Sequence, residues 1–490
     1  MNAIDFFFEK TRSLEKDFLA GRETISFKQL YSEVVQLAQF LEQVYGTDNN
    51  MMLISVNNLF FIKVYLAIIK SGNICIPIDP GIEKGNFAVV AELSGPVLVF
   101  LTKDIPNKLD VGNFKCYSPE SLAACRLPEP KHASGQFDES RCAEIIFTSG
   151  STGKPKGVMI SHRNLIANTR SIVSYLNLKE SDRMMVVLPF FYCYGLSLLH
   201  THLRVGGSIV LNNSFMFIGS VIRNLKEYSC SGFAGVPSHF QILLRKTKEF
   251  KNTCFPDLKY VTQAGGKLAT IFIDEFRNNF PEITFYVMYG QTEATARLSY
   301  LPPEMYETKR GSIGKGIPEV ELKVVDERSV EILPGQFGEV IARGDNIMMG
   351  YYKDQESTEK VLKNGWLYTG DLGTIDDEGY IFLTGRKKEI IKVGGKRISP
   401  KEIEAVILEI PEVVDCYIEG IPDDILGEKI KATIVLSTDS ESSDKLDRIK
   451  QYCHSRLASY KIPQLFELAD KLKISSSGKK TKDISGPGPK

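Results

Sequence analysis

Through the first 300 residues, short apolar runs rich in β-branched side chains alternate with longer amphipathic stretches. Short apolar runs between turn residues predict strands, and apolar positions that repeat every three or four residues predict helices. We predict strands at 52–56, 74–78, 96–101, 184–188, 208–211 and 259–262, and helices at 59–70, 164–175, 196–203 and 271–279. Ser161 is the expected N-cap of the second helix. This alternation is typical of a layered α/β architecture with largely parallel sheets.

The pattern changes after residue 313. Short runs between turns at 321–325, 330–333 and 338–343 predict the strands of a small antiparallel barrel. After Gly385 the pattern is α+β, with helices at 400–408 and 445–459 and strands at 413–418 and 430–436. The predicted fold class is therefore α/β, with a large N-terminal domain of layered sheets plus a small barrel, followed by a small α+β C-terminal domain.

Composition excludes several classes of function. The chain has 490 residues, and its 60 Lys and Arg balance its 60 Asp and Glu, so the formal net charge is zero. The chain therefore lacks the excess of basic residues that would indicate a nucleic acid or an anionic membrane as its partner. The most apolar long region, 51–69, is interrupted by Asn57, Asn58 and Lys63 and is not expected to span a membrane. The first 20 residues carry mixed charges, so no signal peptide is expected.

Nine cysteines are scattered without a C-x-x-C pair, which is typical of reduced thiols in the cytoplasm. The six histidines show no metal-binding spacing, since His200 and His202 are two residues apart and would lie on different faces of a helix. We therefore expect a cytoplasmic protein without a cysteine or histidine metal centre.

The segment 147–157, F-T-S-G-S-T-G-K-P-K-G, carries the strongest chemical signal. Its glycines allow the backbone to bend closely around an anion, and its hydroxyls and lysines supply donors and positive charge. The loop is thus suited to a polyphosphate. A Walker loop is disfavoured, because Thr148 occupies the place of its first glycine and Pro155 that of its Ser or Thr.

The order T-S-G-S-T-G-x-P-K-G resembles the phosphate loop of the adenylate-forming (AMP-binding) enzymes, which include acyl-CoA synthetases, stand-alone adenylation domains and luciferases. Four further segments resemble motifs of that family and follow the family's order. They are Y-G-Q-T-E at 289–293, W-L-Y-T-G-D at 366–371, G-R-K-K-E-I-I-K at 385–392 and S-S-S-G-K at 475–479. The resemblance covers nearly the whole chain.

The resemblance implies an AMP-forming acid–thiol ligase. In such an enzyme a carboxylate attacks the α-phosphate of ATP, and the resulting acyl-adenylate passes its acyl group to a pantetheine thiol. The first step needs two anions held in line and their charge neutralised, rather than a paired acid and base. The resemblance also implies an N-terminal domain at 1–384 and a mobile C-terminal domain at 385–490, with Lys388 as the hinge.

Roles for individual residues follow from the same resemblance. The β- and γ-phosphates of ATP are expected on Thr148, Ser149, Gly150, Ser151, Thr152, Gly153 and Lys154. The rest of the nucleotide is expected on Gly265 and Gly266 beside the adenine, on Tyr289, Gly290 and Gln291, on Thr292 at the α-phosphate, on Asp371 at the ribose and on Arg386. Glu293 is expected to bind Mg²⁺, a hard cation that prefers carboxylate oxygen.

Two lysines are expected to act in different half-reactions. Lys479 is the expected catalytic cation of the first, where it would reach the α-phosphate and the carboxylate together. Its segment departs from the usual pattern, since Lys473 and Ile474 stand where Pro and another residue are common, and Lys480 follows directly. After rotation of the C-terminal domain, Lys392 and the glycines beyond it are expected to face the thiol arm of CoA or phosphopantetheine.

The acyl side of the site is less well marked. The segment 189–195, P-F-F-Y-C-Y-G, resembles the P-x-F-H-x-x-G of acyl-CoA synthetases, but Tyr192 replaces the histidine, whose role cannot be carried over. Phe191, Tyr192, Phe233 and Met288 are candidate pocket residues and suggest an apolar acyl group, although aromatic residues at such spacing are equally typical of a core. The segment has no aspartate to pair with an α-ammonium, which argues against an amino acid substrate.

Several interpretations stay open. We favour transfer of the acyl group of a small carboxylic acid to CoA, and the alternative is a stand-alone adenylation enzyme that loads a separate acyl carrier protein. A catalytically inactive nucleotide-binding protein is disfavoured by the presence of Lys479, Glu293 and Asp371. A luciferase-type oxygenase has no separate support. The identity of the acid and the oligomeric state are left open by the sequence.

Overall fold

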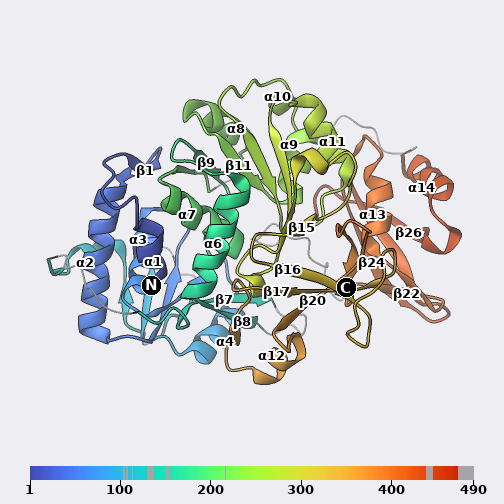
Figure 1. The fold of residues 1–490 in the computed structure, drawn as a ribbon. Helices are drawn as coiled ribbons and strands as arrows, with labels where there is room; N and C mark the ends of the chain where they lie inside the picture. The colour runs from blue at the N-terminus through green and yellow to red at the C-terminus, as the bar shows by residue number, and fades with distance from the viewer. Residues whose placement is uncertain are drawn as a thin grey trace, which may run out of the picture.

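Two large sheets and two small ones form the framework of the protein (Figure 1). The computed structural model describes residues 1–102, 105, 109–112, 114–129, 137–149, 155–213, 215, 217–437 and 445–472. The predicted combination of a large layered α/β region and a smaller C-terminal α+β unit is confirmed.

The first large sheet has nine described strands in the order β15-β14-β13-β12-β11-β9-β10-β1-β2. Its central strands from β13 to β1 are parallel, and the strands at both edges are antiparallel. The bounds are β1 (Asp17–Ala20), β2 (Ile25–Ser26), β9 (Arg183–Val186), β10 (Ser208–Leu211), β11 (Gly232–Gly235), β12 (Tyr260–Gln263), β13 (Thr284–Tyr289), β14 (Ser299–Leu301) and β15 (Lys315–Gly316). In a sheet of this kind the carboxyl ends of the parallel strands meet at one edge, where ligands commonly bind.

The second large sheet has seven described strands in the order β18-β8-β7-β4-β3-β5-β6. They are β3 (Asn50–Ile54), β4 (Ile74–Ile78), β5 (Leu98–Leu101), β6 (Cys116–Tyr117), β7 (Cys142–Ser149), β8 (Pro155–Ser161) and β18 (Gly350–Tyr351). β7 and β8 form an antiparallel pair in which Ser149 lies opposite Pro155. The residues that connect them, 150–154, are the centre of the predicted phosphate loop and lie outside the described residues.

Four helices join the two large sheets into one core, namely α1 (Ala3–Phe8), α3 (Leu59–Lys70), α6 (His162–Leu176) and α7 (Cys193–Val205). α3 is apolar on nearly every side, as expected of a helix buried all round, and the Asn58 side chain caps it by accepting from the N–H of Phe61. The predicted N-cap of α6 is confirmed. The Ser161 side chain accepts from the N–H of Asn164, and the Asn164 side chain accepts from the N–H of Ser161.

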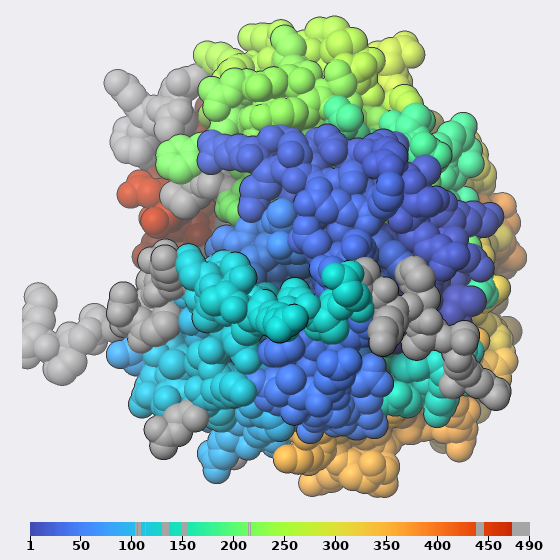
Figure 2. All heavy atoms as spheres, turned by 90° about the vertical axis from the view of Figure 1, so that its left-hand side faces the viewer, coloured from blue at the N-terminus to red at the C-terminus, as the bar shows by residue number. Residues whose placement is uncertain are grey.

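The remaining helices cover the outer faces. α8 (Ile218–Glu227), α9 (Pro237–Arg245) and α11 (Thr270–Asn279) pack on the first sheet, and α4 (Lys84–Ser94) packs on the second. The others are α2 (Phe27–Tyr45), α5 (Pro119–Ala123), α10 (Lys248–Lys251) and α12 (Gln355–Val361). N-terminal residues, drawn blue to cyan, make up most of the face seen in Figure 2. Within the described residues, no helix is long and apolar enough to cross a membrane.

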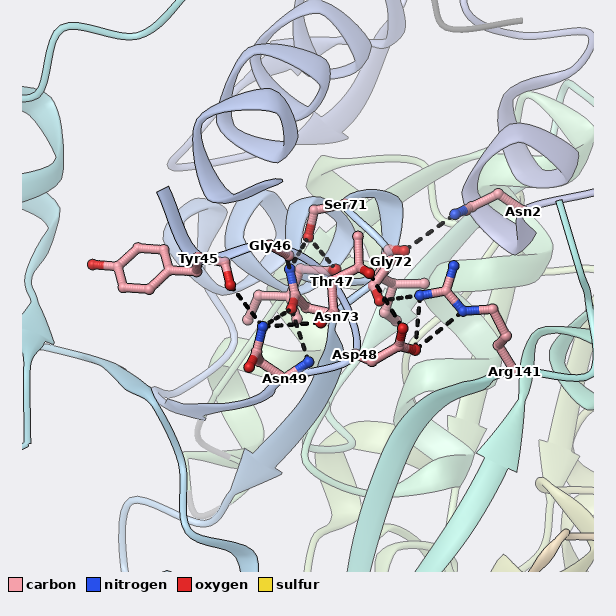
Figure 3. Close-up of polar contacts among 12 residues, drawn as sticks. Asn2, Tyr45, Gly46, Thr47, Asp48, Asn49, Ser71, Gly72, Asn73 and Arg141 are labelled. Carbon is pink, nitrogen blue, oxygen red and sulfur yellow. Dashed lines mark hydrogen bonds and ion pairs between the residues drawn. The ribbon is translucent and has the colours of Figure 1, made fainter. Parts of the chain in front are cut away.

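A polar cluster fixes the start of β7, the strand that leads into the phosphate loop (Figure 3). Arg141, the residue before β7, donates to Asp48 at 2.8 Å and to the carbonyl of Gly72 at 2.9 Å. The side chain of Asn73 accepts from the N–H of Asn49 at 3.0 Å. The turns that follow α2 and α3 are therefore tied both to each other and to β7, which sets where the loop emerges.

The predicted small antiparallel unit is present as β16 (Glu321–Val325), β17 (Gly338–Arg343), β19 (Leu362–Lys363), β20 (Trp366–Ile375) and β21 (Ile381–Arg386). The predicted strand at 330–333 is wrong. Only a single bridge between Val325 and Glu331 occurs there, and Val330 is 60% exposed. The Asp326 side chain accepts from the N–H groups of Arg328 and Val330, so a turn takes up the backbone donors that a strand would need.

The C-terminal unit packs against α9. It contains β22 (Ile391–Val393), β23 (Lys396–Ile398), α13 (Pro400–Leu408), β24 (Val413–Asp423), β25 (Gly427–Leu436), α14 (Lys445–Arg456) and β26 (Leu465–Leu468). Arg245, at the end of α9, donates to the carbonyls of Leu408, Ile410 and Val413 at 3.0, 3.1 and 2.5 Å. It also pairs with Glu275 at 3.2 Å, so one buried guanidinium holds the C-terminal unit against the first sheet.

Candidate active site

Most of the predicted nucleotide-side residues that the structure describes lie at the carboxyl edge of the first large sheet. The segment 189–195 follows β9, Gly265 and Gly266 follow β12, and the Y-G-Q-T-E segment ends β13. β12 pairs with β11 and β13, and β11 pairs in turn with β9, so these loops are neighbours in space. Thr148 and Ser149 end β7 of the second sheet. Lys479 lies outside the described residues, as do residues 150–154.

The Y-G-Q-T-E segment leaves β13 in a tight turn. A Cβ on Gly290 would lie 2.0 Å from the carbonyl oxygen of Ala296, so only glycine allows the chain to fold back this closely. Residues Thr292–Ala294 form a short 3₁₀ turn. The buried hydroxyl of Thr292 lies 3.6 Å from Sγ of Cys193, which begins α7. The turn thus presents Thr292 and Glu293 at the end of the strand.

Asp371 is buried and links two other predicted residues, the buried Tyr289 and the exposed Arg386. Its Oδ2 accepts from the hydroxyl of Tyr289 at 2.6 Å, and its Oδ1 accepts from Nε of Arg386 at 2.9 Å. Burial, together with the charge of Asp371, raises the pKa of Tyr289 well above its usual range. The carboxylate likewise raises the pKa of Arg386, which stays charged. Each carboxylate oxygen retains acceptor capacity, as a pair of ribose hydroxyls requires.

Glu293 is linked to the strand that follows the phosphate loop. Its Oε1 accepts from the hydroxyl of Tyr351 at 2.8 Å, and Nζ of Lys156 lies 4.9 Å from the centre of the Tyr351 ring. Lys156 also donates to Oγ of Ser357 at 2.5 Å. Burial and the charge of Glu293 raise the pKa of Tyr351, so its hydroxyl remains a donor.

The donor set suits one magnesium ion shared with phosphate, rather than an all-protein metal centre. Within the described part of the chain, no group of three or more His, Cys, Asp or Glu could hold a metal. Glu293 has one oxygen bonded to Tyr351, and its other oxygen accepts no hydrogen bond from a described residue. Mg²⁺ commonly takes one or two carboxylates and completes its shell with phosphate and water. The site fits this arrangement.

The residues predicted for the second half-reaction lie in the C-terminal unit. Lys392 lies on β22 with an exposed side chain, and its N–H donates to Glu428 at 2.6 Å. The next two glycines turn the chain into β23, and the N–H of Gly394 donates to the carbonyl of Leu426 at 2.9 Å. Lys388 lies in the turn between β21 and β22. In this structure Lys392 faces solvent, whereas Asp371 is buried.

The candidate acyl residues do not form one apolar cluster. Phe233 packs edge-on against Phe240 beneath the outer helices, and Met288 lies in the other core, between the two large sheets. Phe191 and Tyr192 contact each other edge-on at 5.8 Å, just before α7. Gln263 donates to the carbonyl of Gly266 at 2.8 Å and shapes the turn after β12.

Sequence reasoning missed a charged residue on the acyl side. Arg297 follows Glu293 by four residues, and its side chain is 2% exposed. The guanidinium lies over the ring of Tyr194, 4.7 Å from its centre. Its position in the otherwise uncharged segment 294–301 is the signal that could have marked it. Tyr351 was missed as well, and no motif distinguishes it in the sequence.

Comparisons with known proteins agree with this geometry. The family model described as AMP-binding enzyme matches residues 8–352, and that of the AMP-binding enzyme C-terminal domain matches residues 402–479. The chain is 33% identical to a 2-succinylbenzoate–CoA ligase of Bacillus pumilus over 369 residues, which are 75% of this chain and 73% of that protein. A long-chain-fatty-acid–CoA ligase of Escherichia coli O157:H7 is 32% identical over 341 residues, 69% of this chain and 60% of that protein.

A solved structure has the same overall fold. The o-succinylbenzoate coenzyme A synthetase of Bacillus subtilis, in complex with ATP and magnesium ion, superposes with a TM-score of 0.84 at 26% identity. The match covers 98% of each chain. Since the family model covers well over half of the chain, the chain belongs to the AMP-binding enzymes and is an AMP-forming acid–thiol ligase.

Proposed function

We propose that the carboxyl edge of the first large sheet binds ATP beside a carboxylic acid and joins the two as an acyl-adenylate. The observation that carries this proposal is Asp371, which is 5% exposed and fixed by Tyr289 on one oxygen and by Arg386 on the other. A rigid, charged acceptor of this kind suits the two hydroxyls of a ribose. Thr292, on the turn after Tyr289, then faces the α-phosphate.

The remaining residues act by neutralising and aligning charge. Mg²⁺, when bound, spreads the negative charge of the phosphates, and Glu293 is its proposed protein ligand. The phosphate loop from Thr148 to Lys154 holds the outer phosphates. The acid approaches from the side of α7 and attacks the α-phosphorus, and pyrophosphate leaves with the electron pair of the broken bond. Because the attacking carboxylate has no proton to lose, no general base is needed.

We assign the two lysines to successive steps. Lys479 stabilises the charge that builds up during adenylation, and Lys392 takes its place when the domain 385–490 rotates about Lys388 relative to the domain 1–384. Support comes from the family model, which matches residues 402–479 as a separate C-terminal domain. It comes also from the turn at Lys388, which lies between two strands of different sheets. Hinges are often such short segments between elements.

The test is ATP–pyrophosphate exchange over a panel of aliphatic, aromatic, dicarboxylic and amino acids. We expect at least one acid to support exchange that depends on Mg²⁺, with the amino acids inactive. An enzyme that binds ATP but shows no exchange with any acid in the panel would contradict the proposed function.

Lys479 is tested in the same assay. We expect Lys479→Ala to lose exchange by a factor on the order of a hundred to a thousand. The same variant should still form thioester from a supplied acyl-adenylate. Lys480→Ala is the matched control, since it removes the neighbouring charge and should retain exchange. Loss of exchange in Lys480→Ala alone would transfer the role to Lys480.

CoA is the proposed acceptor, and a separate acyl carrier protein is the alternative. One feature favours the alternative: Ile425, at the turn between β24 and β25, is 92% exposed and lies beside the glycine turn that follows Lys392. An exposed apolar tip of this kind suits a protein partner. Saturable thioester formation with free CoA supports the first acceptor. Weak CoA turnover that a carrier protein restores, and that Ile425→Ser reduces, supports the second.

A reducing compartment such as the cytoplasm is the proposed location. All nine cysteines have free thiols, and burial raises the pKa of several, including Cys142 and Cys230, each to about 12. Such thiols are poor nucleophiles at neutral pH. The expected result is that activity is unchanged by thiol reductants.

A further inference from the structure

Arg297 has the largest side chain among the fully buried residues of the described structure. It lies between the turn that carries Glu293 and strand β14, and its backbone is held rigidly. The carbonyl of Arg297 accepts from Nδ2 of Asn346 at 2.7 Å and from Nδ2 of Asn168 at 3.2 Å. The position of this arginine is therefore fixed by the fold.

Among the described residues, two tyrosines lie close to the guanidinium. It lies over the Tyr194 ring at 4.7 Å, and its charge opposes the burial that raises the pKa of the Tyr175 hydroxyl. Its Nε is buried and has no hydrogen-bond partner among the described residues. Both rings are held in place in turn, since Tyr194 contacts Thr262 at 2.9 Å and Tyr175 stacks on Tyr300 at 4.2 Å. The two tyrosines beside Arg297 are thus held in place, and no described carboxylate pairs with its guanidinium.

Three acidic side chains described above or on β7 have partners other than Arg297. Glu293 accepts from Tyr351, Asp371 is paired with Arg386, and Glu144 accepts from Tyr65 at 2.7 Å. Within the described residues Arg297 forms no ion pair. A buried cation without a counter-charge is strongly unfavourable, and arginine does not relieve the cost by losing its proton. The fold retains the charge nevertheless, which indicates that a ligand supplies the missing anion.

The acyl group is the part of the reacting molecules that comes within reach. Sγ of Cys193 lies 3.6 Å from the hydroxyl of Thr292, and the next residue, Tyr194, has its ring beneath Arg297. Two consecutive residues of α7 therefore contact Thr292, which is proposed to face the α-phosphate, and Arg297. A group on Arg297 would belong to the acid, at some distance from the carboxylate that is activated.

We propose that Arg297 binds a second carboxylate of the substrate, so that the enzyme activates one end of a dicarboxylic acid. The planar guanidinium matches a carboxylate in a two-point hydrogen bond, and the tyrosine rings line the stem between the two ends. The inference rests on the proposed function, because it uses the same acyl site. It replaces the expectation of a wholly apolar acyl group.

The first test compares acids that differ only in the second charge, using wild-type enzyme. The pairs are succinate with butyrate, glutarate with pentanoate, adipate with hexanoate, isophthalate with 3-methylbenzoate and terephthalate with 4-methylbenzoate. We expect kcat/KM in pyrophosphate exchange to favour the dicarboxylate on the order of a hundredfold in at least one pair. If the monoacid is as good or better in every pair, the inference fails while the proposed function stands. If no acid supports exchange, the proposed function fails.

The second test removes the charge. Arg297→Met should lose the preference for the best dicarboxylate, chiefly through KM for the acid, while KM for ATP stays near the wild-type value. Arg297→Lys should recover part of it. The matched control is Arg277→Met, because Arg277 lies over the Tyr306 ring at the same 4.7 Å but pairs with a surface glutamate. An unchanged preference in Arg297→Met would overturn the assignment, and if that variant does not fold, the wild-type comparison decides.

Discussion

The nucleotide side and the acyl side of the site differ in how completely their polar groups are satisfied. On the nucleotide side, Asp371 is bonded to two partners and Glu293 to one before any ligand binds. On the acyl side, Nε of Arg297 is buried without a hydrogen-bond partner in the described structure.

This difference follows from what each side must recognise. Every acid that the enzyme activates is joined to the same nucleotide, so the ribose and metal ligands are best held ready by protein partners. The acyl side must tell one acid from another. A buried polar group that only the correct substrate can satisfy is an effective means of discrimination, because every wrong substrate leaves it unpaired. The buried Nε of Arg297, which has no partner in the described structure, therefore suits a role in selecting the acid.

Among variants that separate the two sides of the site, we expect the largest effect from Asp371→Asn. The amide removes the charge that pairs with Arg386 and weakens the acceptor offered to the ribose, so we expect kcat/KM for ATP to fall on the order of a hundredfold. The ratio of kcat/KM between a dicarboxylic acid and its matched monoacid should stay unchanged. Exchange kinetics with ATP and acid varied in turn measure both. A change in that ratio would show that the two sides are not independent.

Glu293→Gln should have a smaller effect, on the order of tenfold at saturating magnesium, since the amide is a weaker ligand for Mg²⁺. The concentration of Mg²⁺ needed for half-maximal exchange should rise. Tyr351→Phe is the control, because it removes the hydrogen bond to Glu293 but leaves the carboxylate. If Tyr351→Phe raised the Mg²⁺ requirement as much as Glu293→Gln, the tyrosine and not the carboxylate charge would be the important group.

The same contrast decides what could be predicted from the sequence. The nucleotide side is carried by short contiguous motifs, and Gly265, Gly266 and residues 289–293 lie at the carboxyl edge of the first sheet, with Asp371 bonded to Tyr289 there. Two local patterns also predicted the N-cap Ser161 and the strand ends within a few residues. The strand predicted at 330–333 is wrong, because a short hydrophobic run with one charge has the same pattern as an edge strand. The sequence pattern did not reveal the turn at Asp326, which competes with the strand for its backbone donors.

Arg297 could not be predicted, because its meaning depends on contacts that are distant in sequence. A lone arginine in a loop is ordinarily a surface cation, and only the fold shows that Tyr175 and Tyr194 enclose it. The same holds for Phe233 and Met288. Both side chains are apolar, but they lie in separate cores. Residues that hold common chemical groups recur as motifs, whereas residues that select a substrate are set by tertiary packing.

A third prediction concerns the contact that holds the C-terminal unit. Arg245→Met removes donors to three carbonyls of that unit, and we expect cleavage by trypsin in the turn at 386–388 to become several times faster. Lys251→Met is the matched control, because Lys251 pairs with the same Glu275 at 2.6 Å but is not bonded to those carbonyls. The ratio of kcat/KM between a dicarboxylic acid and its matched monoacid should stay at the wild-type value. Equal cleavage of both variants and wild type would mean that Arg245 does not restrain the unit.

The smallest effect on activity is expected at Glu144, a buried carboxyl group on β7. Unlike Arg297, this group can become neutral by a change of protonation. Burial raises the pKa of Glu144 to about 7, although the hydrogen bond from Tyr65 by itself lowers this pKa. Since the folded pKa lies above the unfolded value of 4.5, the folded state binds the extra proton. Its contribution to stability is complete below pH 4.5 and is lost as the pH rises through 7.

Comparison with Glu144→Gln isolates this contribution. The amide still accepts from Tyr65. Burial lowers the pKa of His200, 2.8 Å from the same hydroxyl, to about 3, which is below the pH range of the measurement. Unfolding in urea at a series of pH values should show the free energy of wild type falling relative to the variant by about 3 kcal/mol between pH 4.5 and 7.5. Exchange activity and acid preference should not change. A flat difference would mean that the folded pKa of Glu144 is no higher than the unfolded value of 4.5, so that the fold tolerates an uncompensated buried carboxylate at neutral pH. Arg297, which has no such escape by protonation, would then no longer require an anionic partner.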